Sequence, residues 1–163
     1  MSELTIIFIN VTAVIMLAGL LGTIAAVDMR EKRIPNSLVL AVGVLGLLVS
    51  WFAPLITRSP IEALIGAGVF GGVVLLTAVV TSMITREEAI GGGDIKLAIA
   101  AGIWLGWSWV GVYLLVSCLF FLCAAGVVRL AGHNDRVLPF GPMLGGTLIL
   151  ILLLRIFTFN AVY

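Results

Sequence analysis

Long apolar segments fill almost the whole chain and constrain its fold more than any other feature. A helix needs about 20 mostly apolar residues to cross the hydrocarbon core of a bilayer, which is about 30 Å thick. Of the 163 residues, 62% are hydrophobic and 10% are charged. The mean hydropathy is +1.28, far above the value expected of a soluble domain. The sequence therefore predicts an all-α, polytopic integral membrane protein.

About six membrane-spanning helices are expected, because the apolar runs follow one another with short polar interruptions. They lie at Leu4–Val27, Ser37–Ile56, Ile61–Ile84, Ile95–Leu105, Trp109–Arg129 and Pro142–Phe159. Neither a linker nor a soluble domain is evident, which predicts a single membrane-embedded domain over residues 1–163. Lys and Arg are absent before Arg30, so the first segment lacks the basic start of a signal peptide and is expected to remain as a span.

The region between the fourth and fifth spans has two possible interpretations. Residues 97–128 are too many for one ordinary span and few for two. The chain could turn at Gly106–Ser108, with Trp104, Trp107 and Trp109 marking a membrane interface. Alternatively, the fourth helix is tilted or partly re-entrant. The glycine-rich stretch Gly66–Gly72 is expected to be a helix-contact face, since small residues let helices approach closely in lipid.

The distribution of positive residues predicts the orientation in the membrane. Seven of them lie after the odd-numbered spans: Arg30, Lys32, Arg33, Arg86, Lys96, Arg129 and Arg136. The opposite side has Arg58 and Arg155. Because positive residues stay in the cytoplasm, the odd-numbered loops are expected there and both termini outside. The net charge of +1 does not suggest nucleic acid as a partner.

Two aspartates, Asp28 and Asp94, lie at the edges of apolar segments and on the same predicted side. Carboxylates are costly next to hydrocarbon, so such residues indicate a functional site. Two carboxyls that approach each other cannot both ionise easily, and such a pair can share base and acid roles in peptide hydrolysis. Taken singly, Asp28 could be a juxtamembrane charge and Asp94 a helix N-cap. The glycines Gly91, Gly92 and Gly93 favour instead an unusual backbone or a close approach of another segment to Asp94.

Three segments resemble the type IV prepilin peptidase family. Residues 28–36 (DMREKRIPN) are similar to its Asp-to-Ile-Pro-Asn segment, and residues 86–106 to its Gly-x-Gly-Asp block. Residues 138–142 (LPFGP) match its Pro-Phe-Gly-Pro segment. The resemblance implies a membrane aspartyl endopeptidase in the inner membrane of a prokaryote, with Asp28 and Asp94 as the catalytic pair. The implied substrates are prepilins or pseudopilins, from which the enzyme cuts a basic leader at the cytoplasmic face, in a pilus or secretion system. Neither a metal nor another cofactor is expected.

Other residues near the motifs have weaker assignments. Lys96 could hold an ionised aspartate or orient a substrate carbonyl, or it could be a charge that sets topology. Pro139 and Pro142, which flank Phe140 and Gly141, should impose an extended turn before the sixth span. The resemblance adds for this turn a role as a substrate strand or a wall of the active site. Asn36 or Ser37 is expected to cap the second span.

The cysteines distinguish this chain from many bacterial members, which carry an N-terminal segment with paired Cys-x-x-Cys motifs and also N-methylate the product. Here Cys118 and Cys123 lie inside the fifth span, where they cannot form a four-cysteine zinc site and are expected to be buried packing residues. The chain therefore resembles the short form with peptidase activity alone, and methyltransferase activity is not expected.

Two alternative functions remain open. Presenilin-like and signal-peptide-peptidase-like proteases also use Gly-x-Gly-Asp, but they carry Tyr-Asp and Pro-Ala-Leu motifs, whereas Val27 precedes Asp28 here. A small transporter or scaffold could use the acidic pair as a proton relay. It would conduct ions without cleaving protein, and it would give no reason for the Ile-Pro-Asn and Pro-Phe-Gly-Pro segments.

Overall fold

The computed structural model describes residues 3–52, 59–86, 90–132 and 138–162. Within these ranges the chain forms six α-helices and a short 3-10 helix, so the predicted all-α class is confirmed. The helices are α1 (Glu3–Glu31), α2 (Asn36–Phe52), α3 (Pro60–Thr85), α4 (Gly92–Leu105), η1 (Trp107–Trp109), α5 (Val110–Leu130) and α6 (Gly141–Val162). The predicted end of the second span at Ile56 lies outside the described residues, as do Arg58 and Arg136.

Each predicted span corresponds to one helix, and two of the differences in their limits concern the aspartates. Helix α1 continues to Glu31, four residues beyond the expected Val27, so Asp28 lies in its last turn and not in a loop. Helix α4 starts at Gly92, so Asp94 belongs to its first turn. Between α4 and α5 the chain turns at Gly106, which has φ 75°, and continues through η1.

Within the described residues, length and composition identify three segments as able to cross a membrane: Phe8–Glu31, Pro60–Thr85 and Trp107–Leu130. Two further apolar helices, Asn36–Phe52 and Gly141–Ile156, are shorter. Helix α4 has 14 residues, which corresponds to about 21 Å and is less than the hydrocarbon thickness. The number of six complete spans therefore stays a prediction.

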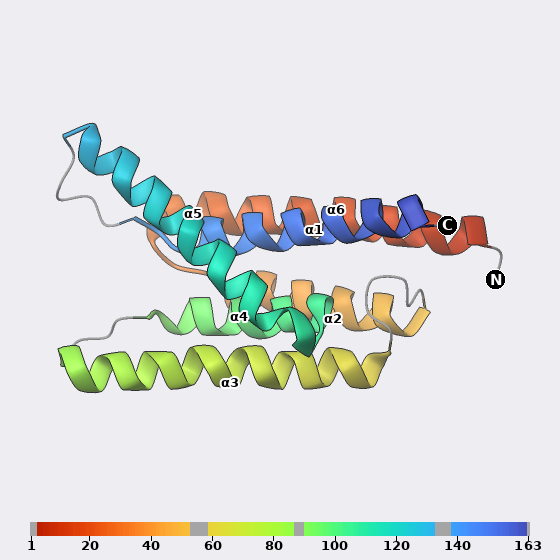
Figure 1. The fold of residues 1–163 in the computed structure, drawn as a ribbon, viewed down its shortest axis with the longest axis horizontal. Coiled ribbons are helices and arrows are strands. Elements are labelled where there is room, and N and C mark those ends of the chain that lie inside the picture. The colour runs from red at the N-terminus through yellow and green to blue at the C-terminus, as the bar shows by residue number, and fades with distance from the viewer. Residues whose placement is uncertain (1–2, 53–58, 87–89, 133–137, 163) are drawn as a thin grey trace.

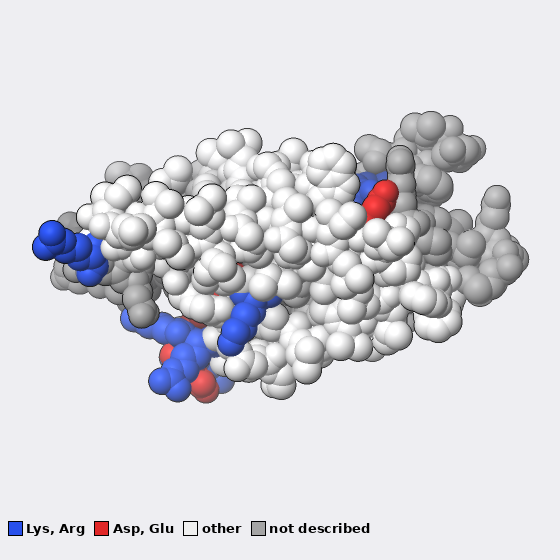
Figure 2. Space-filling model, turned by 90° about the horizontal axis from the view of Figure 1, so that it is seen from below, with Lys and Arg blue, Asp and Glu red and all other residues white. Residues whose placement is uncertain are grey.

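Successive helices run in opposite directions along the long axis of the molecule (Figure 1). One end of the molecule holds the last turns of α1, α3 and α5 together with the first turns of α2, α4 and α6, and the two chain termini lie at the other end. We call the first of these the charged end. Most of the Lys and Arg side chains visible in Figure 2 gather toward it. Its basic residues are Arg30, Lys32, Arg33, Arg86, Lys96 and Arg129.

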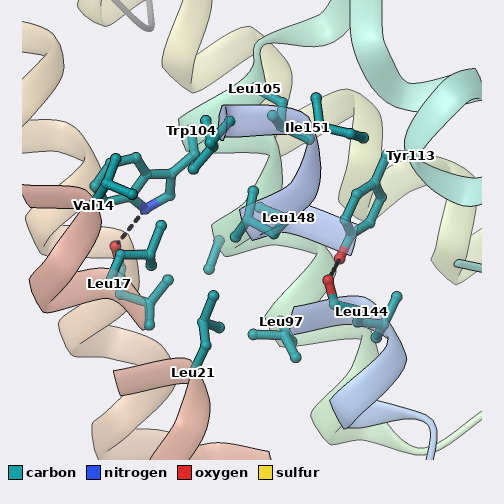
Figure 3. Packing of buried hydrophobic residues seen from close by; sticks show 14 of the residues in the cluster. Val14, Leu17, Leu21, Leu97, Trp104, Leu105, Tyr113, Leu144, Leu148 and Ile151 are labelled. Atoms are coloured by element: carbon teal, nitrogen blue, oxygen red, sulfur yellow. Dashed lines mark hydrogen bonds between the residues drawn. The ribbon is translucent and has the colours of Figure 1, made fainter. Parts of the chain in front are cut away.

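The core lies between α1, α2, α4 and α6, each of which packs against two of the others. Buried leucines such as Leu17 and Leu148 fill this space (Figure 3). Trp104 is also buried, and its Nε1 donates a hydrogen bond to the Val42 carbonyl oxygen at 3.0 Å. The expectation that Trp104 marks a membrane interface is therefore wrong, because its indole N–H finds its partner inside the helix bundle.

Helices α3 and α4 make the most extensive helix contact, through glycines. A Cβ atom at Gly66 would overlap the Gly102 carbonyl oxygen, and one at Gly102 would overlap the backbone of Gly66. At Gly71 an added Cβ would lie 2.6 Å from Ile99 Cγ1. The predicted helix-contact face is thus confirmed at Gly66 and Gly71, whereas Gly68 and Gly72 have nothing within 4 Å.

Helix α5 lies on the outside of the bundle, where two of its residues, Tyr113 and Ser117, are buried. Tyr113 packs on Phe70 of α3 with ring centroids 5.3 Å apart, and its hydroxyl donates to the Leu144 carbonyl of α6 at 3.2 Å (Figure 3). Cys118 and Cys123 are exposed on the same helix. The expectation that they are buried is wrong, because an apolar helix at the edge of a bundle presents most of its side chains to the surroundings.

Candidate active site

Asp28 is buried at the charged end, with 6% of its surface exposed. Its Oδ2 accepts a hydrogen bond at 3.1 Å from the amide of Gly141, the first residue of α6. The carboxylate of the first helix therefore meets the N-terminus of the last one. A helix N-terminus carries unpaired N–H groups and a partial positive charge, which offset part of the cost of burying a carboxylate.

A side chain at position 141 would collide with the Asp28 carboxylate, so glycine suits this position. A Cβ atom there would lie 2.5 Å from Asp28 Oδ2 and 3.2 Å from its Cγ. The absence of a side chain thus allows the α6 backbone to approach the carboxylate. This places the predicted Pro139–Pro142 segment directly against one of the two aspartates. Phe140 adjoins it, accepting backbone hydrogen bonds from Met143 and Leu144 in the first turn of α6.

Asp94 lies in the first turn of α4, with an amide hydrogen bond from Gly91 to its carboxylate. Burial raises the pKa of Asp94 from 3.8 to about 6; the negative charge of Asp28 adds to the increase and the Gly91 hydrogen bond opposes it. Ile34 lies against the Cβ position of Gly93, next to Asp94, and against that of Gly141, which donates to Asp28. The structure therefore brings together the two aspartates that the sequence predicted to share a site.

Ile34 connects the two helix starts around this pair. A Cβ atom at Gly93 would lie 2.9 Å from Ile34 Cβ, and one at Gly141 would lie 3.3 Å from Ile34 Cδ1. Two glycines thus let the N-termini of α4 and α6 close on one isoleucine. Lys32, whose φ is 53°, reverses the chain after α1 and donates its amide to the Asp28 carbonyl at 2.9 Å. This turn directs Ile34 back toward the aspartates.

The three glycines Gly91–Gly93, for which the sequence predicted an unusual backbone or a close approach, differ in what surrounds them. Gly93 has the expected close approach of another segment, whereas Gly92 has nothing within 4 Å. Gly91 has extended backbone angles, φ −66° and ψ 143°, and its Cβ position lies 3.5 Å from the Asp94 carboxylate. These glycines therefore supply one close contact, at Gly93, and one amide donor, at Gly91. None of them has a positive φ angle.

Lys96 does not contact either aspartate among the interactions described; its Nζ donates a hydrogen bond to Asn36 Oδ1 at 2.9 Å. This contact joins the first turns of α2 and α4. Neither Ile34 nor Asn36 was singled out as a site residue from the sequence, although both belong to the Ile-Pro-Asn segment. Their position directly after the aspartate-bearing helix was the available signal.

The raised pKa of Asp94 predicts a pH dependence of stability. The folded protein binds this proton more tightly than the unfolded chain, whose aspartate keeps its ordinary pKa of 3.8. The resulting stabilisation is complete below about pH 4 and is lost as the pH rises through about 6. We expect Asp94→Asn, which cannot ionise, to weaken the fall in melting temperature over this interval. Thermal unfolding in detergent at several pH values measures it. Equal pH dependence in both proteins would contradict the assignment.

Comparison with known proteins agrees with the motifs. The model of the type IV leader peptidase family matches residues 15–158. The prepilin leader peptidase/N-methyltransferase of Aeromonas hydrophila is 30% identical over 136 residues, which cover 81% of this chain and 46% of that protein. The enzyme of the same name from Xanthomonas campestris pv. campestris is 34% identical over 134 residues, or 80% and 45% of the two chains.

The corresponding Escherichia coli (strain K12) protein is 31% identical over 123 residues, covering 75% of this chain and 54% of that protein. The chain thus spans about half the length of the curated relatives it matches. No solved structure matches it. Because the family model covers most of its length, the chain belongs to the type IV leader peptidase family.

Proposed function

We propose that the chain is a membrane aspartyl endopeptidase that removes the basic leader from type IV prepilins or pseudopilins. The observation that carries the proposal is the convergence of Asp28 and Asp94 with two helix N-termini at the charged end. Relatives named prepilin leader peptidases and the family model support the substrate class. The three motifs of the sequence also meet here, since Asp28, Asp94 and Gly141 come from different motifs.

The two carboxyls divide the chemistry of hydrolysis between them. The Gly141 amide donates a hydrogen bond to Asp28, which favours the charged form of that carboxyl. In this scheme Asp28 is therefore the carboxylate, and Asp94 holds the proton that the pair shares. Asp28 takes a proton from a water molecule, and the water oxygen bonds to the carbonyl carbon of the scissile peptide. Asp94 gives its proton to the carbonyl oxygen. The Asp28 proton then passes to the leaving nitrogen as the carbon–nitrogen bond breaks, and the intermediate returns its hydroxyl proton to Asp94.

The Gly141 amide has a positioning role in this scheme. By donating to Asp28 Oδ2, it occupies one oxygen of the carboxylate and leaves the other to face water. The fixed amide also needs no reorganisation when charge moves during the reaction, which is the advantage of preorganised donors in a poorly solvated site.

The site is proposed to face the cytoplasm. The charged end holds six of the seven described Lys and Arg residues, and Arg155 lies toward the opposite end. Positive residues flanking spans remain cytoplasmic, so both termini are outside the inner membrane. A basic leader would remain on the cytoplasmic side for the same reason, close to the aspartates. That this chain does not methylate the cleaved product stays a prediction, which rests on the cysteine pattern.

Replacing either aspartate tests the function. We expect Asp28→Asn and Asp94→Asn each to reduce leader cleavage by about 100-fold or more, because the pair then cannot both take and give a proton. Glu31→Gln is the matched control, since Glu31 is an exposed carboxylate in the same turn as Asp28. Co-expression with candidate prepilins, a mobility-shift blot and N-terminal sequencing of the product measure cleavage. Full processing by either aspartate variant at normal expression would refute the proposal.

Gly141→Ala tests the contact with Asp28. Its Cβ would press against the carboxylate, so we expect a lower kcat at unchanged membrane content. Gly146→Ala is the matched control on the same helix, because nothing lies within 4 Å of its Cβ position. The ratio of the two cleavage rates in purified enzyme is the measurement. Equal rates would show that the approach of α6 to Asp28 does not matter for catalysis.

Cysteine labelling tests the orientation. In a background with Cys118→Ser and Cys123→Ser, we expect a cysteine at Glu31 or Glu87 to react only with reagents that reach the cytoplasm. A cysteine at Ser59 should react from outside, because Ser59 precedes α3 at the opposite end from Glu31. If the Glu31 and Glu87 positions react from different faces, the two aspartates cannot share one site.

A further inference from the structure

A groove of about 430 Å³ runs along the outer surface between α2 and α4. Leu40, Gly43 and Leu47 line it from α2, and Ile99, Ala100 and Ile103 line it from α4. Its walls are apolar along this length, and its polar lining residues, Asn36 and Lys96, lie at one end. The hydrogen bond between these two residues therefore marks the mouth of the groove.

The mouth of the groove adjoins the aspartate pair. Lys96 follows Asp94 by two residues in the first turns of α4, and Asn36 follows Ile34 by two residues. Ile34 itself lies against the Gly93 and Gly141 positions beside both aspartates. A substrate chain that leaves the groove at its mouth would thus reach Asp94 by crossing one turn of α4.

We infer that this groove binds the substrate through an apolar helical segment on the C-terminal side of the scissile bond. The inference rests on the proposed function and adds to it the surface that holds the substrate. From Asn36 to Leu47 the groove follows three turns of α2, about 16 Å, which accommodates about eleven residues of a helix. The bound segment therefore becomes helical within a few residues of the cleaved bond.

Small residues make this surface suited to a helix. Gly43 is half-buried, and the nearest atom to its Cβ position is Ile103 Cδ1 at 3.4 Å. With Ala100 opposite on α4, it leaves room for a third helix to approach closely, as helix contacts in lipid require.

The polar mouth meets the needs of a helix that starts there. The first turn of any helix has N–H groups without partners inside that helix, and these are costly at the edge of a membrane. Asn36 Oδ1 is an acceptor at this position, and Lys96 can donate to the carbonyls of the extended residues that lead to the aspartates. A lipid acyl chain would use the apolar walls but would not need the acceptor.

Filling the groove tests the inference. We expect Gly43→Leu to raise the KM for an intact prepilin on the order of tenfold, with kcat retained at saturation, because the leucine occupies the space of the bound helix. The same variant should cleave a short peptide that lacks the apolar segment as the wild type does. Gly72→Leu is the matched control, because Gly72 lies on α3 with nothing within 4 Å of its Cβ position.

A crosslinking measurement separates the substrate from lipid. A photoreactive residue at Leu47 should form an adduct with the apolar segment of a prepilin that is bound to the Asp94→Asn enzyme. Adducts with lipid alone, or an unchanged KM in Gly43→Leu, would overturn the inference. Equal losses for intact prepilin and short peptide would also overturn it. Failure of the wild-type enzyme to cleave any prepilin would instead refute the proposed function itself.

Discussion

The hydrogen bond from the Gly141 amide to Asp28 is the constraint on which the site depends. It joins the end of the first helix to the start of the last, across 113 positions of the chain. A buried carboxylate needs fixed donors, and a helix start supplies them without another charged side chain. Asp94 lies in the first turn of its own helix, α4, and accepts from the Gly91 amide directly before that helix. Among the residues that the structure describes, the starts of α4 and α6 thus take the place of counterions for this acidic pair.

The position of Asp94 depends on how α4 is held. This helix is short, and its glycine contact with α3 leaves no room for a side chain at Gly66 or Gly102. At its other end Arg155 of α6 donates to the Leu105 carbonyl at 3.2 Å, and its guanidinium lies 5.4 Å from the centre of the Trp109 ring. Since a short helix leaves its last carbonyls unpaired, this cation stabilises the end that lies farthest from the site. Close packing along α4 therefore sets where its first turn, and Asp94, can lie.

The sequence could predict those features whose free-energy cost depends on the residue and its neighbours along the chain. A carboxylate beside hydrocarbon is expensive wherever its partners are, so Asp28 and Asp94 stood out, and the positive residues placed them on one side. The limits of the helices were also close, because apolar length determines them. Which helices touch is different: nothing in the hydropathy of α3 and α4 specifies that Gly66 meets Gly102. Trp104 was misplaced for a related reason, since tryptophan suits both an interface and a buried site with one acceptor, here Val42. The contact of Ile34 with two helix starts likewise depends on the turn at Lys32.

A peptidase at a membrane surface must bring together water and an apolar substrate, and the ends of helices are where these meet. Under the proposed function, water would reach the aspartates from the charged end, because basic residues and helix termini favour hydration there. The groove opens along the side of the bundle between α2 and α4, on a mostly apolar surface. Because Asp94 and Lys96 lie in the same turn of α4 but on different faces of it, that turn separates the two environments. A substrate that lies in the groove and crosses the turn would present its peptide bond to water at the point where its helix begins.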